Sequence, residues 1–330
     1  MIKIGINGFG RIGRLALRSI INRANIEVVA INDLIDIDQL AYLLKFDSVH
    51  GRFKGTVIVK NDVLIVNDKS IRITSEAKPE DIQWDALDVD FVIESTGYFT
   101  NKNQAALHLK GGAKKVVISA PSKDVPNFVM GVNNTKLSKN DLIFSNASCT
   151  TNCLAPKVKV LNDNIKIIEG LVTTVHASTS SQNVVDGFSE KWRRGRAALN
   201  NMIPTSTSAS ETLIKIIPEM EGKILAMAVR VPVVDVSLID VTVRLKKATS
   251  YNEIKAVMKS ASENELKGIL GYTEDEVVSQ DFVSEPRTSV FDANAGMELN
   301  ENFFKIISWY DNEFGYATKL VDLIEYSDSL

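Results

Sequence analysis

The sequence predicts an α/β protein that combines a doubly wound, mostly parallel sheet with an α+β part built on a large, mostly antiparallel sheet. Strand and helix patterns alternate over residues 1–145, as in a parallel sheet covered by helices. After residue 150, long strand patterns dominate instead. At 330 residues, two domains are expected rather than one large core.

The first part of the chain supplies the parallel sheet. Ile2–Asn7 has a strand pattern, and Arg11–Arg23 carries apolar residues at helical spacing. The elements expected after these are a strand at Glu27–Asn32, a helix at Ile37–Phe46, two strands within Thr56–Val66, a strand at Asp90–Glu94, a helix at Asn103–Lys110 and a strand at Lys115–Ser119.

The second part supplies the antiparallel sheet. We expect a helix through Cys153–Leu161 and a final helix at Glu313–Tyr326. The strands expected between them are Ile167–His176, Lys223–Pro232, Leu238–Leu245, Thr288–Phe291 and Phe303–Tyr310. A long polar stretch separates His176 from Ile203, and a loop of this length is usually functional. The boundary between the two parts is expected near Ser148.

Composition excludes several classes of protein. The chain is 45% hydrophobic and 24% charged with a net charge of −3, so no nucleic-acid or anionic membrane partner is expected. No apolar run approaches the roughly 20 residues of a membrane span. The N-terminus starts directly as a strand, so no secretory signal is expected. Two cysteines make no disulfide framework, and a cytoplasmic location fits.

A glycine motif predicts a dinucleotide site. The segment GFGRIG at 8–13 matches G-x-G-x-x-G, with glycines at Gly8, Gly10 and Gly13. It follows a predicted strand and opens a predicted helix, so the turn can approach a pyrophosphate at the helix N-terminus. Asp33 lies 33 − 13 = 20 residues past the last glycine, where a carboxylate binds the ribose of NAD and repels the extra phosphate of NADP. The alternative is a glycine-rich turn with a surface aspartate.

Cys149 and His176 form the candidate catalytic pair. Cys149 is placed at a helix start, where the N-terminus and a nearby imidazole would lower its pKa. His176 ends a strand 176 − 149 = 27 residues later, and the two could form a nucleophile with its general base. The competing interpretation of His176 alone is a core histidine.

The other cysteine and histidines are expected to be structural. Cys153 lies four residues after Cys149 on one helix face, a poor geometry for a disulfide, and too few further ligands are present for a metal. Cys153 is therefore expected to be buried, with a resolving-cysteine role as the alternative. His50 is expected to be structural or solvated, and His108 to lie on the surface.

Longer motifs carry a resemblance to a known family. The segments SNASCTTNCLAP (145–156) and INGFGRIGR (6–14), with TTVHA (173–177) and SWYDNEFGY (308–316), resemble phosphorylating glyceraldehyde-3-phosphate dehydrogenases. Further matching segments cover effectively the whole chain. The resemblance implies an NAD-binding domain at 1–148, onto which the C-terminal helix 313–330 packs back, and a catalytic domain at 149–312.

The resemblance also assigns site residues and partners. Cys149 is implied as the nucleophile and His176 as its base and later acid. The positions implied to bind NAD, glycine motif included, are Gly8, Gly10, Arg11, Ile12, Gly13, Asp33, Ser119 and Asn312. The positions implied to bind substrate and phosphate are Ser148, Thr150, Thr179, Ser181, Arg194, Thr207, Ser208 and Arg230. The implied partners are glyceraldehyde 3-phosphate, inorganic phosphate and three further copies in a homotetramer; no metal is implied.

The expected chemistry uses these groups in sequence. The thiolate adds to the aldehyde, hydride passes to NAD and leaves a thioester, and phosphate attack then releases an acyl phosphate. Two phosphoryl groups held in one cleft would explain the paired hydroxyls and the arginines. The rival interpretations are an erythrose-4-phosphate dehydrogenase and a catalytically weak NAD-binding scaffold that acts through protein partners.

One local hypothesis concerns the segment Ser208–Glu211. Its S-x-x-E pattern fits a capping box before an apolar run, in which the Glu211 carboxylate accepts from the Ser208 N–H. The resemblance places the backbone of Ser208 at the site of the attacking phosphate. We therefore expect Glu211 to compete with that anion; an exposed cap away from the ligand is the alternative.

Overall fold

The computed structural model describes all residues, 1–330, and they form two compact units. The first unit comprises Met1–Phe128, Asn134–Ala147 and Ala317–Leu330. The second comprises Val129–Asn133 and Ser148–Tyr316.

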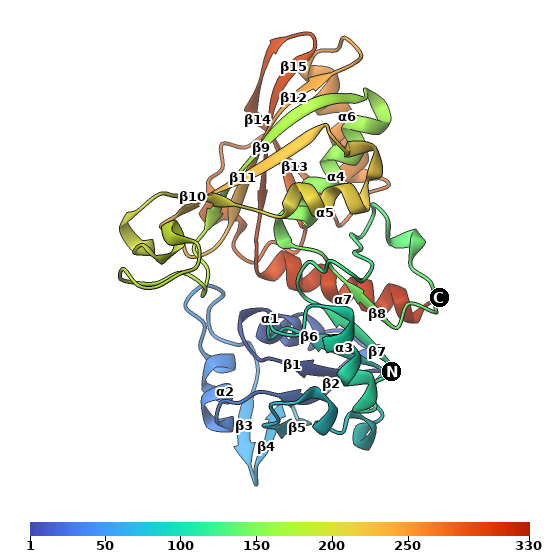
Figure 1. Cartoon of the computed structure of the whole chain (residues 1–330), viewed down its shortest axis with the longest axis vertical. Coiled ribbons are helices and arrows are strands. Elements are labelled where there is room, and N and C mark those ends of the chain that lie inside the picture. The colour runs from blue at the N-terminus through green and yellow to red at the C-terminus, as the bar shows by residue number, and fades with distance from the viewer. The chain divides into compact units, whose positions relative to one another are not determined.

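An eight-stranded sheet forms the centre of the first unit (Figure 1). Its order is β3 (Val57–Lys60), β4 (Val63–Val66), β5 (Lys69–Thr74), β2 (Ile26–Asn32), β1 (Ile2–Asn7), β6 (Phe91–Glu94), β7 (Lys115–Ile118) and β8 (Ile143–Ser145). All neighbours from β5 to β8 are parallel, and only β3–β4–β5 pair antiparallel. The predicted doubly wound, mostly parallel sheet is confirmed.

Helices complete the first unit. They are α1 (Arg11–Ile20), α2 (Ile37–Lys45), α3 (Lys102–Lys110) and most of α7 (Phe314–Asp328). Ion pairs from Arg23 to Asp322 and Glu325 hold α7 against the rest of this unit. The Nζ of Lys115 adds a hydrogen bond to Ser327 Oγ at 3.0 Å.

A seven-stranded sheet forms the second unit. Its order is β10 (Ile203–Ser206), β11 (Ile224–Val231), β9 (Ile167–Ala177), β12 (Ser237–Leu245), β15 (Phe303–Tyr310), β14 (Ser289–Asn300) and β13 (Leu270–Thr273). Only β11–β9 and β13–β14 are parallel. The predicted mostly antiparallel sheet is confirmed.

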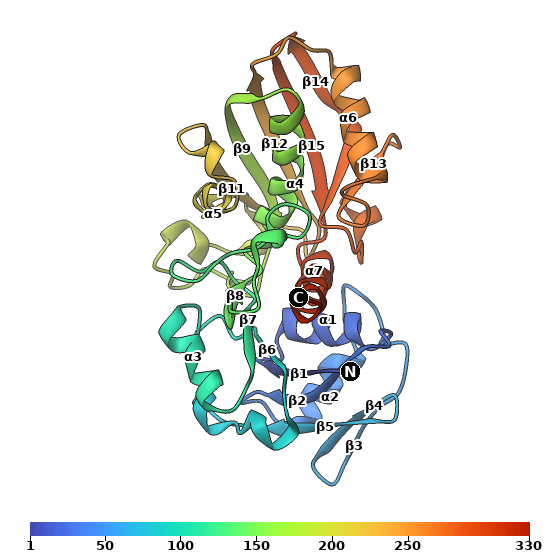
Figure 2. The same ribbon diagram turned by 90° about the vertical axis from the view of Figure 1, so that its right-hand side faces the viewer.

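The two faces of this second sheet differ. Helices α4 (Cys149–Asn164), α5 (Ala209–Ile216) and α6 (Tyr251–Glu263) lie on one face (Figures 1 and 2). On β9 and β11 the side chains of Leu171 and Leu225 point away from the buried positions next to them and are 65% and 71% exposed. Leu171, Leu225 and Met227 form an apolar strip on this face that is uncovered within the chain, while Asp240 and Lys305 form an ion pair on the same face of β12 and β15.

Several elements were missed or misjudged from the sequence. Short strands β5, β8, β10 and β13 were not predicted, because each buries few residues and gives little periodicity. Helix α6 was missed although Ser250 and Glu253 form a capping box before it. Helix α1 ends at Ile20 rather than Arg23, where the Arg23 side chain turns back to the Ser19 carbonyl.

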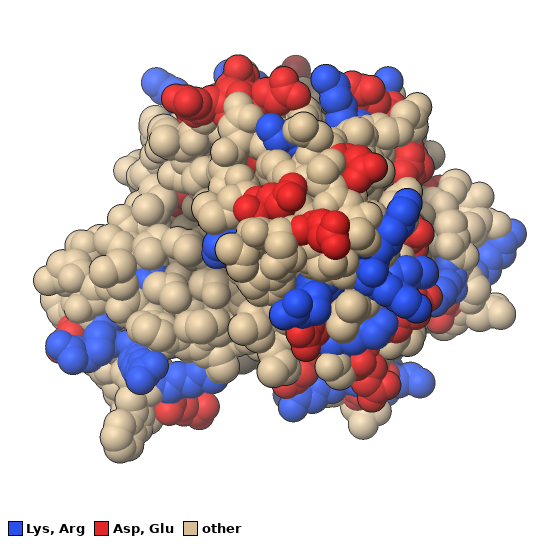
Figure 3. Space-filling view, turned by 90° about the horizontal axis from the view of Figure 1, so that it is seen from above, with Lys and Arg blue, Asp and Glu red and all other residues tan.

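Two further features concern the length of the helices and the charges on the surface. None of the helices combines the length and apolar character needed to cross a bilayer. On the face shown in Figure 3, basic and acidic side chains are interspersed, in keeping with the small net charge of −3.

Candidate functional site

Cys149 is the first residue of α4. Ser148 caps the helix in an extended conformation, and its hydroxyl accepts a hydrogen bond from Thr151 N at 3.0 Å. The amide groups of this first turn have no partners within the helix, so the positive end of its dipole lies at the Cys149 backbone. A half-buried thiol therefore stands beside donors that could stabilise an oxyanion.

His176 faces this thiol from β9. Its Nε2 lies 3.6 Å from Cys149 Sγ, and its Nδ1 lies 2.7 Å from the Ala177 carbonyl oxygen. Nδ1 faces two groups of opposite kind: the Ala177 carbonyl oxygen, which can only accept, and Arg230 NH1, 2.6 Å away, which can only donate. The tautomer with its proton on Nδ1, bonded to Ala177, leaves the Nε2 lone pair facing the thiol. This tautomer can take the thiol proton, and the geometry is that of a nucleophile with its general base.

Burial holds both members of the pair neutral at rest. It raises the pKa of Cys149 to about 11, against the opposing charge of Arg230. Burial, with the Arg230 charge second, lowers the pKa of His176 to about 3. The lowered thiol pKa expected from the helix start is therefore wrong, because desolvation outweighs the favourable groups.

Arg230 completes this cluster. The parallel pairing of β11 with β9 sets Arg230 beside His176, and its NH1 donates to the Ala177 carbonyl at 2.9 Å. Its Nε is buried without a hydrogen-bond partner. A fixed guanidinium with an unused buried donor next to a nucleophile is suited to an anionic ligand.

Other implied substrate positions lie in small groups of the same unit. Thr150 Oγ1 is 3.1 Å from Tyr310 Oη, which also lies 2.9 Å from Thr174 Oγ1. Thr179 Oγ1 lies 2.9 Å from Ser181 Oγ, so these two hydroxyls are adjacent.

Arg194 is hydrogen-bonded to the neighbouring segment 205–206. Its Nε donates to Thr205 Oγ1 at 3.0 Å and its NH2 to the Ser206 carbonyl at 3.1 Å. Its charge nevertheless contributes to the lowered pKa of His176. No hydrogen bond joins Arg194 to Cys149 or His176, so its effect on His176 is electrostatic.

The Ser208–Glu211 capping box is not formed. Ser208 has φ −86° and ψ 8° and makes no side-chain cap, whereas Ser250, which does form a capping box, is extended at φ −112° and ψ 160°. Thr207 Oγ1 accepts the Ala209 N–H instead, at 3.2 Å. The hypothesis that Glu211 competes for the Ser208 N–H through such a box is wrong, because the backbone at Ser208 lacks the conformation it needs.

Asn312 is oriented by a short chain of hydrogen bonds. The hydroxyl of Ser237 donates to Asn312 Oδ1 at 2.7 Å and accepts from Ala177 N at 3.0 Å. Ala177 follows His176 directly, so the end of β9 and Asn312 are both hydrogen-bonded to Ser237. With its carbonyl oxygen held, the Asn312 amide presents its NH₂ group in a fixed direction.

A cavity of about 560 Å³ lies in the first unit at the carboxyl ends of β1, β2 and β6, the place where doubly wound sheets bind ligands. It is lined by Asn7, Gly8, Gly10, Asn32, Asp33, Leu34, Glu76, Ala77, Ser95, Thr96, Tyr98 and Phe99. Most of the predicted glycine motif and Asp33 are thus brought to one cavity.

The glycine motif fits a dinucleotide phosphate. Gly8 has φ +89°, and a Cβ there would lie 2.7 Å from Thr96 N. A Cβ on Gly13 would lie 2.2 Å from the Gly8 carbonyl oxygen, so only glycine lets α1 pack this close. Gly10 has open space beside it, which a diphosphate at the helix start can occupy. The glycine turn and the start of α1 therefore fit the diphosphate of NAD.

The remaining predicted cofactor residues surround this motif. Asp33 Oδ2 accepts the Phe9 N–H at 2.6 Å, which fixes the carboxylate beside the glycine turn. Arg11 NH1 pairs with Asp47 Oδ2 at 2.6 Å. Ser119 follows β7, and its N–H donates to the Glu94 carbonyl at 2.9 Å. Ile12 is half-buried in the first turn of α1.

Of the expectations about the burial of Cys153 and His108, the first is confirmed and the second is wrong. Cys153 is fully buried, with its Sγ 3.6 Å from Ser289 Oγ, as expected. His108 was expected on the surface, but its exposed fraction is 0%. Its ring lies between Trp84 and Glu94, two residues that are distant in sequence and give no local signal.

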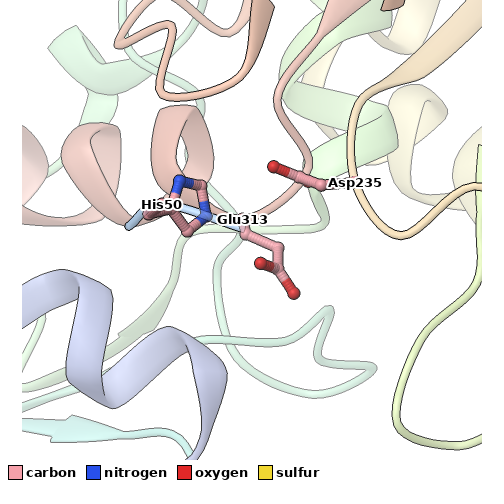
Figure 4. A group of neighbouring side chains, drawn as sticks. All are labelled: His50, Asp235 and Glu313. Atoms are coloured by element: carbon pink, nitrogen blue, oxygen red, sulfur yellow. The ribbon is translucent and has the colours of Figure 1, made fainter. Parts of the chain in front are cut away.

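Buried charges in the second unit were also missed. Lys157 is fully buried in α4 with no hydrogen-bond partner for its Nζ, and burial lowers its pKa to about 8. Burial, with repulsion from Asp311 and Glu313, raises the pKa of Asp235 to about 9. Figure 4 draws Asp235 and Glu313, both from the second unit. The sequence gives no clear signal for Lys157 either, because Lys159 lies two residues later in the same apolar helix pattern.

Comparison with known proteins agrees with this geometry. Residues 2–102 match the family model described as glyceraldehyde 3-phosphate dehydrogenase, NAD binding domain, and residues 148–312 match the C-terminal domain of the same family. Glyceraldehyde-3-phosphate dehydrogenase A of Escherichia coli (strain K12) is 58% identical over 98% of each chain. Glyceraldehyde-3-phosphate dehydrogenase 2 of Mucor circinelloides f. lusitanicus is 56% identical over 98% of this chain and 97% of that protein.

Proposed function

This chain belongs to the glyceraldehyde-3-phosphate dehydrogenase family, and on that premise we propose that Cys149 and His176 catalyse its reaction. The protein is an NAD-dependent oxidoreductase of glycolysis that oxidises glyceraldehyde 3-phosphate. The observation that carries the proposal is the 3.6 Å approach of Cys149 Sγ to His176 Nε2 at the start of α4.

The pair acts in two stages. His176 Nε2 takes the thiol proton, and the thiolate adds to the aldehyde carbon. The resulting oxyanion faces the amides of the first turn of α4 and takes the proton back from His176 to give a neutral thiohemiacetal. His176 then accepts the hydroxyl proton as hydride leaves the same carbon and a thioester forms on Cys149. Bound NAD supplies the hydride acceptor. Inorganic phosphate attacks the thioester, the thiolate leaves, and 1,3-bisphosphoglycerate is released.

Anionic groups need donors close to this pair. We assign Arg230 to the substrate because its buried Nε has no protein partner and its guanidinium lies beside His176. Thr179 and Ser181 offer two adjacent hydroxyls, and Arg194 adds positive charge. The remaining positions assigned to substrate and phosphate are Ser148, Thr150, Thr207 and Ser208.

The cofactor site is assigned to the glycine motif and its surroundings. Gly8, Gly10 and Gly13 leave room for the diphosphate, and Arg11 and Ile12 add the first turn of α1. The fixed carboxylate of Asp33 would accept ribose hydroxyls and repel the extra phosphate of NADP. Ser119 and the oriented amide of Asn312 complete the set. We accordingly assign residues 1–148, with helix 313–330, to NAD binding and 149–312 to catalysis.

We also infer a homotetramer in the cytoplasm. The apolar strand face with Leu171, Leu225 and Met227 is uncovered within one chain, and a patch of this kind is typical of a subunit interface. A thiol nucleophile without a disulfide partner suits a reducing compartment.

Purified protein incubated with glyceraldehyde 3-phosphate, NAD and phosphate tests the function. NADH should form continuously, and without phosphate it should stop near one equivalent per active site, because the thioester then turns over slowly. Erythrose 4-phosphate as substrate separates the rival dehydrogenase, which would favour it. NAD binding without any turnover would overturn the enzymatic function and leave the scaffold interpretation.

A further inference from the structure

The floor of the cofactor cavity is built on a buried hydrogen-bond chain in the first unit. Asn32 lines the cavity and is 3% exposed. Its Oδ1 accepts from Thr74 Oγ1 and Glu76 N, both at 2.8 Å, and its Nδ2 donates to the Glu76 carbonyl at 2.9 Å. Its second amide hydrogen goes to Asn7 Oδ1 at 2.8 Å. Asn32 thus fastens the 74–76 segment to the ends of β2 and β1.

Glu94 is the next link. Asn7 Nδ2 donates to Glu94 Oε2 at 2.7 Å, and His108 Nε2 lies 2.9 Å from the same oxygen. Glu94 Oε1 accepts from the Thr96 backbone N–H and hydroxyl. A carboxylate only 1% exposed thus receives four hydrogen bonds. It orients Asn7 and Thr96, which both line the cavity.

His108 anchors the other end of the chain. Trp84 Nε1 is 3.1 Å from His108 Nδ1. Indole can only donate, so Nδ1 must accept and the ring proton lies on Nε2, aimed at Glu94. The imidazole is therefore neutral and held in one tautomer. Its ring also meets the cavity-lining ring of Phe99 edge to face, with centroids 6.2 Å apart.

We propose that His108 is a positioning residue for NAD, acting through the Glu94 network of Trp84, His108, Glu94, Asn7 and Asn32. His108 does not line the cavity, but it donates to the carboxylate that orients two of the lining residues and packs against a third. A preorganised wall binds its ligand without having to order those groups first. This inference rests on the proposed function, which supplies NAD as the occupant of the cavity.

Two substitutions at His108 separate hydrogen bonding from packing. In His108→Gln the amide nitrogen reaches the place of Nε2 and can still donate to Glu94. In His108→Asn the shorter amide reaches only the place of Nδ1, so it can accept from Trp84 but leaves Glu94 without this donor. Both variants lack the imidazole ring. If His108 acted only by packing, NAD binding would therefore weaken equally in both.

NAD affinity measured by calorimetric titration is the direct readout. His108→Asn should weaken NAD binding roughly tenfold, the scale of losing one hydrogen bond to a buried charge, while His108→Gln should stay within about threefold of the parent. At saturating NAD, kcat and the KM for glyceraldehyde 3-phosphate should change less than twofold. Equal weakening in both variants, or unchanged affinity in folded His108→Asn, would overturn the inference.

A third variant covers the case in which His108→Asn does not fold. Trp84→Phe removes the indole donor that selects the tautomer, and it should weaken NAD binding about threefold. Unchanged affinity in Trp84→Phe would count against the network. Failure of the parent protein to bind NAD would instead refute the proposed function, so the two failures are distinguishable.

Discussion

In the first unit, Glu94 receives four hydrogen bonds and Asn32 uses both of its amide hydrogens, whereas in the second unit Arg230 keeps a buried Nε without a partner. The first arrangement fixes geometry, since every group in it is already paired. The second leaves an unused donor beside a reactive thiol, which is where a ligand can contribute binding energy. At these two places, the paired polar groups fix the geometry and the unpaired donor is left for a ligand.

The largest effect should come from His176. Replacing it by glutamine removes the base and should lower kcat by roughly 10²- to 10⁴-fold. The residual rate should rise with pH throughout the alkaline range, because a buried thiol with a pKa of about 11 must then ionise unaided. A pH–rate profile measures this, with Cys153→Ser as a control of unchanged activity. A flat alkaline profile at near-parent kcat would refute the assignment of the base.

A substitution at Lys157 tests whether a buried group without a hydrogen-bond partner in the second unit must be functional. Lys157→Met should raise the free energy of unfolding by about 2–3 kcal/mol at pH 7, because it removes a buried charge. The folded pKa, about 8, lies below the usual 10.5, so the penalty on the lysine is complete at pH values below 8 and disappears as the pH approaches 10.5.

Denaturant unfolding at pH 7 and pH 10 measures the free energy of unfolding of Lys157→Met and of the parent. The matched control is Lys159→Met on the same helix, where the lysine is exposed and paired with Asp163, and a change under about 0.5 kcal/mol is expected. Loss of stability in Lys157→Met at both pH values would show that the ammonium has a partner that stabilises it.

Arg230 should show the binding effect of an unpaired donor. Arg230→Gln should raise the KM for glyceraldehyde 3-phosphate roughly thirtyfold, equivalent to losing about 2 kcal/mol of charge-assisted hydrogen bonding. The KM for NAD serves as the internal control and should stay within twofold. A variant in which both KM values rise together would point to disruption of the unit rather than loss of an anion contact.

Asp235 should show the smallest of these effects. Asp235→Asn should raise the free energy of unfolding by about 1–2 kcal/mol at pH 7. With a folded pKa of about 9 the buried carboxyl group must take up a proton on folding, a cost that the neutral amide avoids. Its folded pKa, about 9, exceeds the ordinary 3.8, so stability is lost as the pH rises between these values. The difference between variant and parent should therefore vanish near pH 4, as thermal melts can show. Glu221→Gln, at an exposed carboxylate, is the neutral control.

The kind of contact that each residue makes explains which features could be predicted from the sequence. The fold class and the approach of Cys149 to His176 could be predicted because a helix start, a strand end and a glycine turn leave local patterns. His108 could not, because its partners Trp84 and Glu94 come from other elements and give α3 no distinctive periodicity. The Ser208 cap failed for a related reason: its sequence pattern was right, but its backbone angles are set by the surrounding structure.

The most direct test of the account is to trap the acyl group on the protein. Enzyme mixed with glyceraldehyde 3-phosphate and NAD without phosphate should carry one 3-phosphoglyceryl group as a thioester, located by fragmentation mass spectrometry of the peptide that contains both cysteines. The account predicts that the group lies on Cys149, is absent from Cys149→Ser, persists in Cys153→Ser and disappears when phosphate is added. Acylation of Cys153, or NADH formation without any acyl-enzyme, would contradict it.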